Sequence, residues 1–418
     1  MVLRDDIWHA RPARAWLLCT GPRRLPRLVR YRPTRRQAIA TWVKRGGSRL
    51  ARVFWFPPAL EGFPVIAIDH RFRIWRWLAP LLLVLPLAAF AQTNAGVGFS
   101  PITIHDPVNG GTMPGYVFYP SSQASRVTRV GPYELHATRN APPIAGTKPL
   151  VVISHGHGGD DLEFRNMAIL LASHGFIAAT LLHPKDNYLD GSGNGHAAVL
   201  GGRPIQVSAT ISMLLNDPRW KTLVDPNRIG AAGFSAGGYT ALLLVGAVPR
   251  FDRLMTYCDE NPADKEGICE FLKTLPAPDQ SLKSYLGALQ KKYTHWGNPD
   301  DPRVKAAFAM APFSVVFGKD GLATVNRPVF LYYGQNDHVL IPQYNVLHIA
   351  PLIKSLDGMK MVPNAGHYVF MGPCSPQLAK HLPSICQAPS GVDRAAVQRQ
   401  VNADALTFFR KTLVTPSR

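Results

Sequence analysis

Short apolar runs alternate with amphipathic stretches along the chain from about residue 92 onward. A strand that is buried on both faces of a parallel sheet needs apolar side chains at successive positions. The runs therefore predict strands at 116–120, 149–155, 176–184, 228–235, 304–312, 328–337 and 359–367. Helical spacing of the apolar positions predicts helices at 162–175, 206–217, 237–247 and from Arg394 to Leu413. This alternation predicts a doubly wound, mostly parallel α/β sheet.

Residues 248–301 interrupt this rhythm with a more polar segment that contains two helix-like stretches. We expect a helical insertion at the edge of the sheet. Long insertions often serve function but need not do so. The segment is either a cap that shapes a substrate pocket or a simple surface excursion.

A basic stretch with Arg71, Arg73 and Arg76 precedes an apolar run of about 14 residues, which ends in the small-x-small sequence "AFA". This order is typical of a secretory signal peptide, and the run is shorter than the roughly 20 residues of a membrane span. We expect a signal peptide at 66–91, no stable membrane span after its removal, and a periplasmic or secreted catalytic domain at 92–418. A buried helix or an uncleaved anchor is the alternative.

The basic charge is concentrated in the first part of the chain. Residues 1–91 hold 17 of the 46 Lys and Arg residues but only 4 of the 27 Asp and Glu residues, in a chain with a formal charge of +19. Residues 1–65 read as a basic leader that is disordered or not translated. Because the remainder is only mildly basic, we expect no nucleic-acid partner.

Four cysteines remain once Cys19 is removed with the leader. An even count in an exported chain favours disulfides, and sequence proximity pairs Cys258 with Cys269 and Cys374 with Cys386. Four cysteines permit three connectivities, so proximity alone supports this choice. Neither pair has the C-x-x-C spacing of a zinc site.

The stretch "IGAAGFSAGGYTALLL" (229–244) surrounds Ser235 with glycine and alanine. Gly233-Phe234-Ser235-Ala236-Gly237 matches G-x-S-x-G and falls between a predicted strand and a predicted helix. In that context a sharp turn lifts the serine above the sheet, and small neighbours let the strand and the helix pass closely. The five-residue pattern alone is weakly specific, and its context strengthens it.

A nucleophilic serine needs a base and an orienting acid, which follow it in the order Ser, acid, His in this architecture. Asp337 and His367 each come directly after a predicted strand. His338 adjoins Asp337 too closely to accept its hydrogen bond and also face the serine, and His348 falls on a helical stretch. Asp320 is a weaker substitute for the acid.

Two backbone N–H groups are needed to hold an oxyanion. One is expected from Ala236, the residue after the nucleophile, and the other from the glycine-containing loop "SHGHGGD" (154–160). His155 and His157 in this loop lack an obvious third metal ligand, so we expect no metal and no cofactor.

Together "VVISHGHGG", "LASHGFIAATLLHPKDN", "GFSAGG", "GQNDHVL" and "AGHYVF" resemble the α/β-hydrolase superfamily over about residues 98–415. Within it they resemble the bacterial dienelactone-hydrolase-like group related to platelet-activating-factor acetylhydrolases. The resemblance implies Ser235 as nucleophile, Asp337 and His367 as its partners, and the amides of His157 and Ala236 as the oxyanion hole. Dienelactone hydrolases carry cysteine where this chain has Ser235.

We therefore expect an exported serine hydrolase that cleaves small-molecule or lipid-like carboxylic esters through an acyl-enzyme. A phospholipase or acetylhydrolase and a polyester hydrolase are alternatives within this chemistry. A non-catalytic binding protein that retains the fold is an alternative from a different class. The aromatic residues that either line an apolar acyl site or pack in the core are Tyr239, Phe313, Phe317, Tyr368 and Phe370.

Overall fold

The computed structural model describes residues 96–414, apart from 263, 265–266, 276–278 and 375. The expected leader (1–65) and signal peptide (66–91) lie outside the described residues. Both stay predictions, as does the exported location that depends on them.

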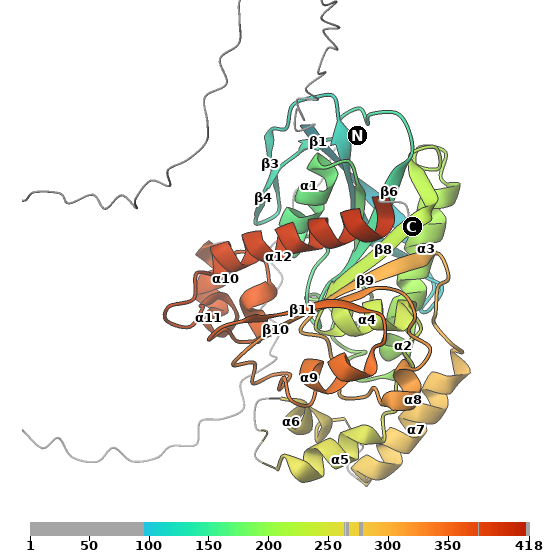
Figure 1. Cartoon of the computed structure of the whole chain (residues 1–418), viewed down its shortest axis with the longest axis vertical. Coiled ribbons are helices and arrows are strands. Elements are labelled where there is room, and N and C mark those ends of the chain that lie inside the picture. Colours follow the sequence, from blue (N-terminus) through green and yellow to red (C-terminus); the bar gives the residue numbers. More distant parts are fainter. Residues whose placement is uncertain (1–95, 263, 265–266, 276–278, 375, 415–418) are drawn as a thin grey trace, which may run out of the picture. The chain divides into compact units, whose positions relative to one another are not determined.

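A nine-stranded sheet forms the centre of the described part (Figure 1), in the order β11-β10-β9-β8-β6-β7-β2-β1-β5. Only the β1–β2 and β2–β7 pairs are antiparallel, and the other neighbours run parallel. The nine strands are β1 (Gly96–His105), β2 (Thr112–Ser121), β5 (Thr138–Arg139), β6 (Lys148–Ser154), β7 (Ile177–Leu181), β8 (Val224–Phe234), β9 (Val304–Met310), β10 (Val329–Gly334) and β11 (Leu356–Val362). The predicted mostly parallel sheet is confirmed.

The sequence patterns predicted part of β2 but missed β1 and β5 at one edge of the sheet. Strand β1 contains Gly96, Gly98 and Pro101, which weaken a strand pattern. The structure requires Gly98 because a Cβ there would lie 2.4 Å from the ring of Tyr119 on β2. A separate hairpin, β3 (Val127–Val130) with β4 (Tyr133–His136), was also not predicted.

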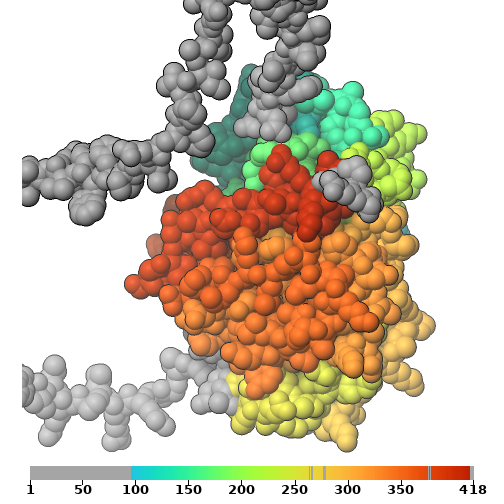
Figure 2. All heavy atoms as spheres, in the orientation of Figure 1, coloured from blue at the N-terminus to red at the C-terminus, as the bar shows by residue number. Residues whose placement is uncertain are grey.

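Helices cover both faces of the sheet and bury two separate apolar cores. On one face, α1 (Arg165–Ser173) and α12 (Arg394–Phe409) pack over Phe308 and Phe234. On the other face, α3 (Gly202–Asn216) and α4 (Ala236–Leu244) pack over Val152 and Ile229. In the space-filling view, the red C-terminal segment lies directly against the orange segment that precedes it (Figure 2). The remaining short helices are α2 (Ala197–Leu200), α8 (Lys319–Leu322), α9 (Val346–Ile349), α10 (Pro376–His381) and α11 (Pro383–Cys386), with short 3-10 turns at Ala350–Leu352 (η1) and His367–Phe370 (η2) and a π turn at Arg410–Val414 (η3).

The predicted insertion is present as three helices, α5 (Arg253–Glu260), α6 (Ile268–Leu272) and α7 (Leu282–His295). They gather at one end of the fold, next to α9 (Figure 1). The Cys258–Cys269 disulfide joins α5 to α6, with a sulfur–sulfur distance of 2.05 Å. The Cys374–Cys386 disulfide ties the segment after the sheet to α11. The structure thus forms both disulfides that sequence proximity favoured.

The stretch Ala197–Asn216, which covers α2 and α3, is long and apolar enough to cross a membrane by length and composition alone. More than half of it is buried within the protein, and α3 contacts β1, β6 and α4. A core helix of a globular domain passes the same test, and this packing identifies α3 as one.

The direction of chain progression reverses at strands β6 and β8, which are neighbours in the sheet. From β6 the chain continues to β7 on one side, whereas from β8 it continues to β9, β10 and β11 on the other. Loops at the carboxyl ends of two such strands diverge to opposite faces and leave a crevice between them. Ser235 follows β8 and the "HGHGG" loop follows β6, so both lie at this point.

Candidate active site

Ser235 occupies a strained turn between β8 and α4. Its φ of 54° and ψ of −115° lie outside the conformations that a serine ordinarily adopts. Two backbone hydrogen bonds fix the turn: Ser235 N donates to Met310 O (2.9 Å), and Phe313 N donates to Ser235 O (3.2 Å). The end of β9 and the segment after it therefore hold the half-buried serine in the sharp turn that the sequence motif predicts.

The small residues around Ser235 are required by close backbone contacts. A Cβ on Gly233 would lie 2.1 Å from Gly237 O, and a Cβ on Gly237 would lie 1.9 Å from Ser154 O. A Cβ on Gly156 would lie 2.9 Å from the Phe234 ring and 3.6 Å from Ser235 Cβ. The loop after β6 therefore passes directly beside the serine.

Asp337 and His367 meet as the sequence order predicts. His367 Nδ1 lies 2.7 Å from Asp337 Oδ2, and both side chains are almost fully buried. The other carboxylate oxygen, Oδ1, accepts hydrogen bonds from the amides of Val339 (2.9 Å) and Leu340 (2.7 Å). The carboxylate is thus held on both sides, and it fixes the imidazole with Nε2 directed away from Asp337.

His367 packs against Phe234, the residue that precedes Ser235. The rings of Phe234 and His367 lie 4.7 Å apart between centroids. No hydrogen bond joins Ser235 Oγ to His367 among the described residues, and such catalytic contacts often tighten only when substrate binds. The structure brings all three predicted triad residues into one region and closes the His–Asp half of the triad.

The competing candidates lie elsewhere. His348 Nε2 contacts Phe317 O at 2.9 Å and the Arg253 guanidinium of α5 at 2.9 Å, so this ring nitrogen is already occupied. His338 is solvent-exposed beside Asp337, and Asp320 is exposed on α8. The dyad of His367 with Asp337 is the arrangement that the structure contains.

The amides of His157 and Ala236 face no hydrogen-bond acceptor among the described residues. Ala236 is the first residue of α4, whose N-terminal N–H groups point away from the helix without intrahelical partners. His157 follows Gly156, which passes Ser235 closely. Both amides are therefore free to donate a hydrogen bond. They lie on the two segments beside Ser235 that the sequence analysis named.

Sequence reasoning missed a polar network beneath this loop. Arg203 on α3 is 1% exposed, and its guanidinium donates to Asp186 Oδ2 at 2.6 Å. It also donates to the carbonyl oxygen of His155 and to Ser154 Oγ at 3.1 Å. Asp186 in turn bonds His157 Nδ1. Asp186 follows a strand just as Asp337 does, which is the signal that could have found it.

The charges in this network are balanced. Burial alone would raise the pKa of Asp186, but Arg203 and His157 hold it below its usual value. Burial, together with the Arg203 charge, lowers the pKa of His155 to about 3. His155 is therefore neutral, and its Nε2 accepts from His183 N at 3.1 Å. That bond occupies the nitrogen that a metal would need, and the described residues contain no cluster of three metal-ligating side chains.

The insertion borders the loop that carries His157. Phe271 of α6 lies 6.5 Å from the His157 ring between centroids. The rings of Tyr257 on α5 and Tyr344 lie 5.1 Å apart between centroids. Burial, the contact with Asp264 and, to a smaller extent, the charge of Asp337 raise the pKa of Tyr257. Phe271 of α6 therefore lies against the loop that carries His157, and Tyr257 of α5 lies against Tyr344.

The five aromatic candidates for an acyl site divide into two groups. Tyr239, Phe317 and Phe370 are buried core residues. Phe313, whose amide bonds Ser235 O, and Tyr368, whose ring is 5.3 Å from that of His367, are partly exposed beside the triad. Of the five, these two therefore lie nearest to Ser235 and His367 without being fully buried.

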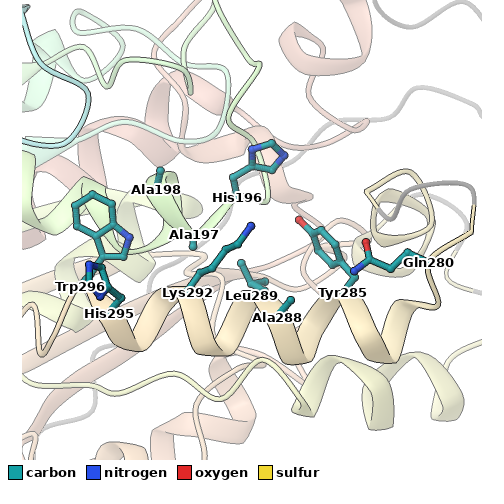
Figure 3. Close-up of a pocket in the computed structure, with 10 residues that line it drawn as sticks. All are labelled: His196, Ala197, Ala198, Gln280, Tyr285, Ala288, Leu289, Lys292, His295 and Trp296. Carbon is teal, nitrogen blue, oxygen red and sulfur yellow. The ribbon is translucent and has the colours of Figure 1, made fainter.

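A cavity of about 510 Å³ lies between α2 and α7. Figure 3 shows Lys292 and Tyr285 rising from α7 on the side that faces His196 and Ala197. Tyr285 donates to Gly195 O at 3.1 Å, and the neighbouring Asn194 lies 2.8 Å from His157 Nε2. The wall of this cavity is thus tied to the loop beside Ser235, although none of its lining residues belongs to the predicted site.

Comparisons with known proteins identify the fold. A solved structure of a ferulic acid esterase from Streptomyces cinnamoneus is similar, with a TM-score of 0.50 and 18% sequence identity over 78% of this chain and 94% of that chain. No protein-family model matches the chain. No curated protein matches it either. The structural likeness, with the sheet order described above, establishes the α/β-hydrolase fold.

Proposed function

We propose that the protein is a serine hydrolase that cleaves carboxylic esters through an acyl-enzyme on Ser235. The observation that carries the proposal is the strained Ser235 turn beside a buried dyad in which His367 Nδ1 lies 2.7 Å from Asp337 Oδ2. A serine held in this geometry, with an oriented imidazole on one side and free amides on the other, is suited to acyl transfer. The esterase named above, which shares the fold, agrees with this chemistry.

In the proposed mechanism, His367 Nε2 removes the proton from Ser235 Oγ as the oxygen attacks the acyl carbonyl. The amides of His157 and Ala236 donate to the developing oxyanion. Asp337 keeps the proton on His367 Nδ1 and stabilises the imidazolium, which then protonates the leaving alcohol. Water, deprotonated by the same imidazole, hydrolyses the acyl-enzyme and releases the acid.

The cap and the two partly exposed aromatics supply the proposed substrate-binding walls. Phe313 and Tyr368 lie beside the proposed triad, and Phe271 of α6 lies 6.5 Å from the His157 ring. Apolar walls with few polar groups suit a small-molecule or lipid-like ester. The dienelactone-hydrolase-like relationship and an exported location remain part of this proposal.

Ser235→Ala tests the function directly. We expect hydrolysis of p-nitrophenyl acetate to fall by about 10⁴-fold or more, because no other group can form the acyl-enzyme. A fluorophosphonate should label wild-type protein and not the variant, whereas a binding protein that only retains the fold would not be labelled. Wild-type activity that survives the substitution would refute the assignment.

A further inference from the structure

Arg203 connects the two segments that carry the proposed oxyanion amides. On one side it donates to His155 O and to Ser154 Oγ (3.1 Å), directly before Gly156 and His157. On the other side its Nε lies 3.3 Å from Thr240 Oγ1, in the helix that follows Ser235. Thr240 Oγ1 in turn donates to Ala236 O at 2.8 Å. One side chain therefore spans the loop after β6 and the first turns of α4.

A third contact of Arg203 fixes the His157 residue itself. Arg203 Nη1 donates to Asp186 Oδ2 at 2.6 Å, and the other oxygen of Asp186 accepts from His157 Nδ1. Asn194 donates to His157 Nε2 at 2.8 Å, so the proton of this ring lies on Nδ1. The ring is held at both nitrogens, and the backbone that bears the His157 amide is held with it.

The network continues away from the site and leaves no member unpaired. Ser154 Oγ accepts from Arg203 and lies 2.9 Å from His183 Nε2, and His183 Nδ1 lies 2.7 Å from Gln206 Oε1. Gln206 then donates to Asp106 Oδ1 at 3.1 Å. Burial and the nearby Arg203 charge lower the pKa of His183 well below its usual value, so this ring accepts from Ser154 as a neutral imidazole.

Placing a guanidinium at 1% exposure costs free energy that an apolar residue would not cost. A planar fork with fixed donors, however, can hold several acceptors at set distances, which neither an apolar side chain nor a lysine can do. We propose that Arg203 is the positioning residue of the oxyanion hole: it sets the spacing between the His157 and Ala236 amides. This inference rests on the proposed ester hydrolysis.

Arg203→Lys is the principal test, because it keeps the charge against Asp186 and removes the fork. With p-nitrophenyl butyrate we expect kcat to fall by about 10–100-fold with KM within about 3-fold, since the hole acts on the transition state. A trifluoromethyl ketone, which adds to the nucleophilic serine and places its oxyanion in the hole, should bind weaker by a similar factor.

Arg303→Lys is the matched control. Arg303 donates to Ser212 Oγ (2.9 Å) and Ser208 O (3.1 Å) of the same helix α3 and to Asp301, but it touches neither amide-bearing segment. Because the Arg303 side chain is 32% exposed, we expect a smaller change in thermal midpoint than for Arg203→Lys and a kcat within about 2-fold of wild type. Equal losses of kcat in the two lysine variants would overturn the inference, as would an unchanged kcat in folded Arg203→Lys.

Thr240→Val is the second test, for the case in which Arg203→Lys does not fold. It removes the acceptor on α4 and leaves the contacts to His155 and Asp186 in place. We expect kcat to fall by about 3–10-fold with KM unchanged, and wild-type kcat in this variant would also overturn the inference. An inert wild-type protein would instead refute the proposed function, so the two failures are distinct.

Discussion

Two His–Asp pairs lie in loops beside Ser235, and they differ in what holds the second oxygen of the carboxylate. In the His367–Asp337 pair, the neutral amides of Val339 and Leu340 hold it. In the His157–Asp186 pair, the Arg203 cation holds it at 2.6 Å. The charge of Asp186 is therefore already neutralised, whereas that of Asp337 remains to stabilise an imidazolium.

The rings differ in the same sense. His157 is bonded at both nitrogens, to Asp186 and to Asn194, and its side chain is 42% exposed. The His367 side chain is 3% exposed, and its Nε2 has no hydrogen-bond partner among the described residues. A general base needs a free nitrogen and an uncompensated carboxylate behind it. In the proposed mechanism the same two residue types therefore serve proton transfer in one loop and loop rigidity in the other.

The largest expected contrast comes from removing each ring. His367→Ala should lower kcat for p-nitrophenyl acetate by about 10⁴–10⁶-fold, because Ser235 loses its base. His157→Ala keeps the backbone amide and should lower kcat by about 10-fold or less. Steady-state kinetics on both purified variants, with circular dichroism as the folding control, measures the difference. Similar losses in the two variants would remove the distinction between the pairs.

Neutralising each carboxylate separates activity from stability. Asp337→Asn should lower kcat by about 10⁴-fold, because the asparagine favours the wrong imidazole tautomer, with little loss of stability. Asp186→Asn should lower kcat by only about 10-fold but destabilise the fold by about 3–5 kcal/mol, because it leaves Arg203 as a buried unpaired charge.

Urea unfolding and steady-state kinetics measured on both carboxylate variants test this crossed pattern. The pKa of Asp186 lies below its usual value, so its stabilising contribution is present at neutral pH and is lost as the pH falls through the folded-state pKa. The stability deficit of Asp186→Asn should therefore shrink in acid. A deficit that grows as the pH falls would contradict the proposed charge pairing.

The sequence predicted the His367–Asp337 pair but not the His157–Asp186 pair, and the difference has a physical cause. Ser235, Asp337 and His367 each follow a strand, and chain order assigns their roles, so a linear pattern suffices. Gly233 and Gly237 can be recognised in the sequence motif because the turn requires them: a Cβ at either position would lie about 2 Å from a backbone oxygen. Arg203 carries no such signal, because one arginine at the start of a helix is typical of a solvated face and only tertiary packing buries it.

The edge of the sheet and the cap show the same limit. The parallel strands from β6 to β10 are largely apolar runs and were predicted, whereas β1 combines burial with glycines such as Gly98, which clears the Tyr119 ring. The insertion was recognisable as a break in rhythm. Its contact with the site depends on single ring contacts such as Phe271 with His157, which no periodicity encodes.

A buried acid distinguishes the His157 side of the site further. Neither oxygen of Glu163 has a hydrogen-bond partner in the described part of the chain, and burial, with the charge of Asp160, raises the pKa of Glu163 to about 8. The folded state therefore holds this proton above pH 4.5, where the unfolded chain has released it. Stability should fall as the pH rises from about 4.5 to about 8.

Glu163→Gln removes this titration and should raise the free energy of unfolding by about 2–4 kcal/mol at pH 9, with little change at pH 4.5. Asp161→Asn is the matched comparison, since burial and Asp160 raise the Asp161 pKa to about 7 and give a smaller effect of the same sign. Urea unfolding across this range provides the measurement. An equal gain at both pH values would show that packing, rather than ionisation, is responsible.

The smallest expected effect concerns Asn194, which bonds His157 Nε2. In His367 the same ring nitrogen has no hydrogen-bond partner among the described residues. Asn194→Ala removes the 2.8 Å contact and leaves Asp186 to hold the ring alone. Because Arg203 still fixes the loop at His155 O, we expect kcat to change by less than about 3-fold. A loss as large as that of Arg203→Lys would mean that the His157 ring, and not the arginine beneath it, determines where the amide lies.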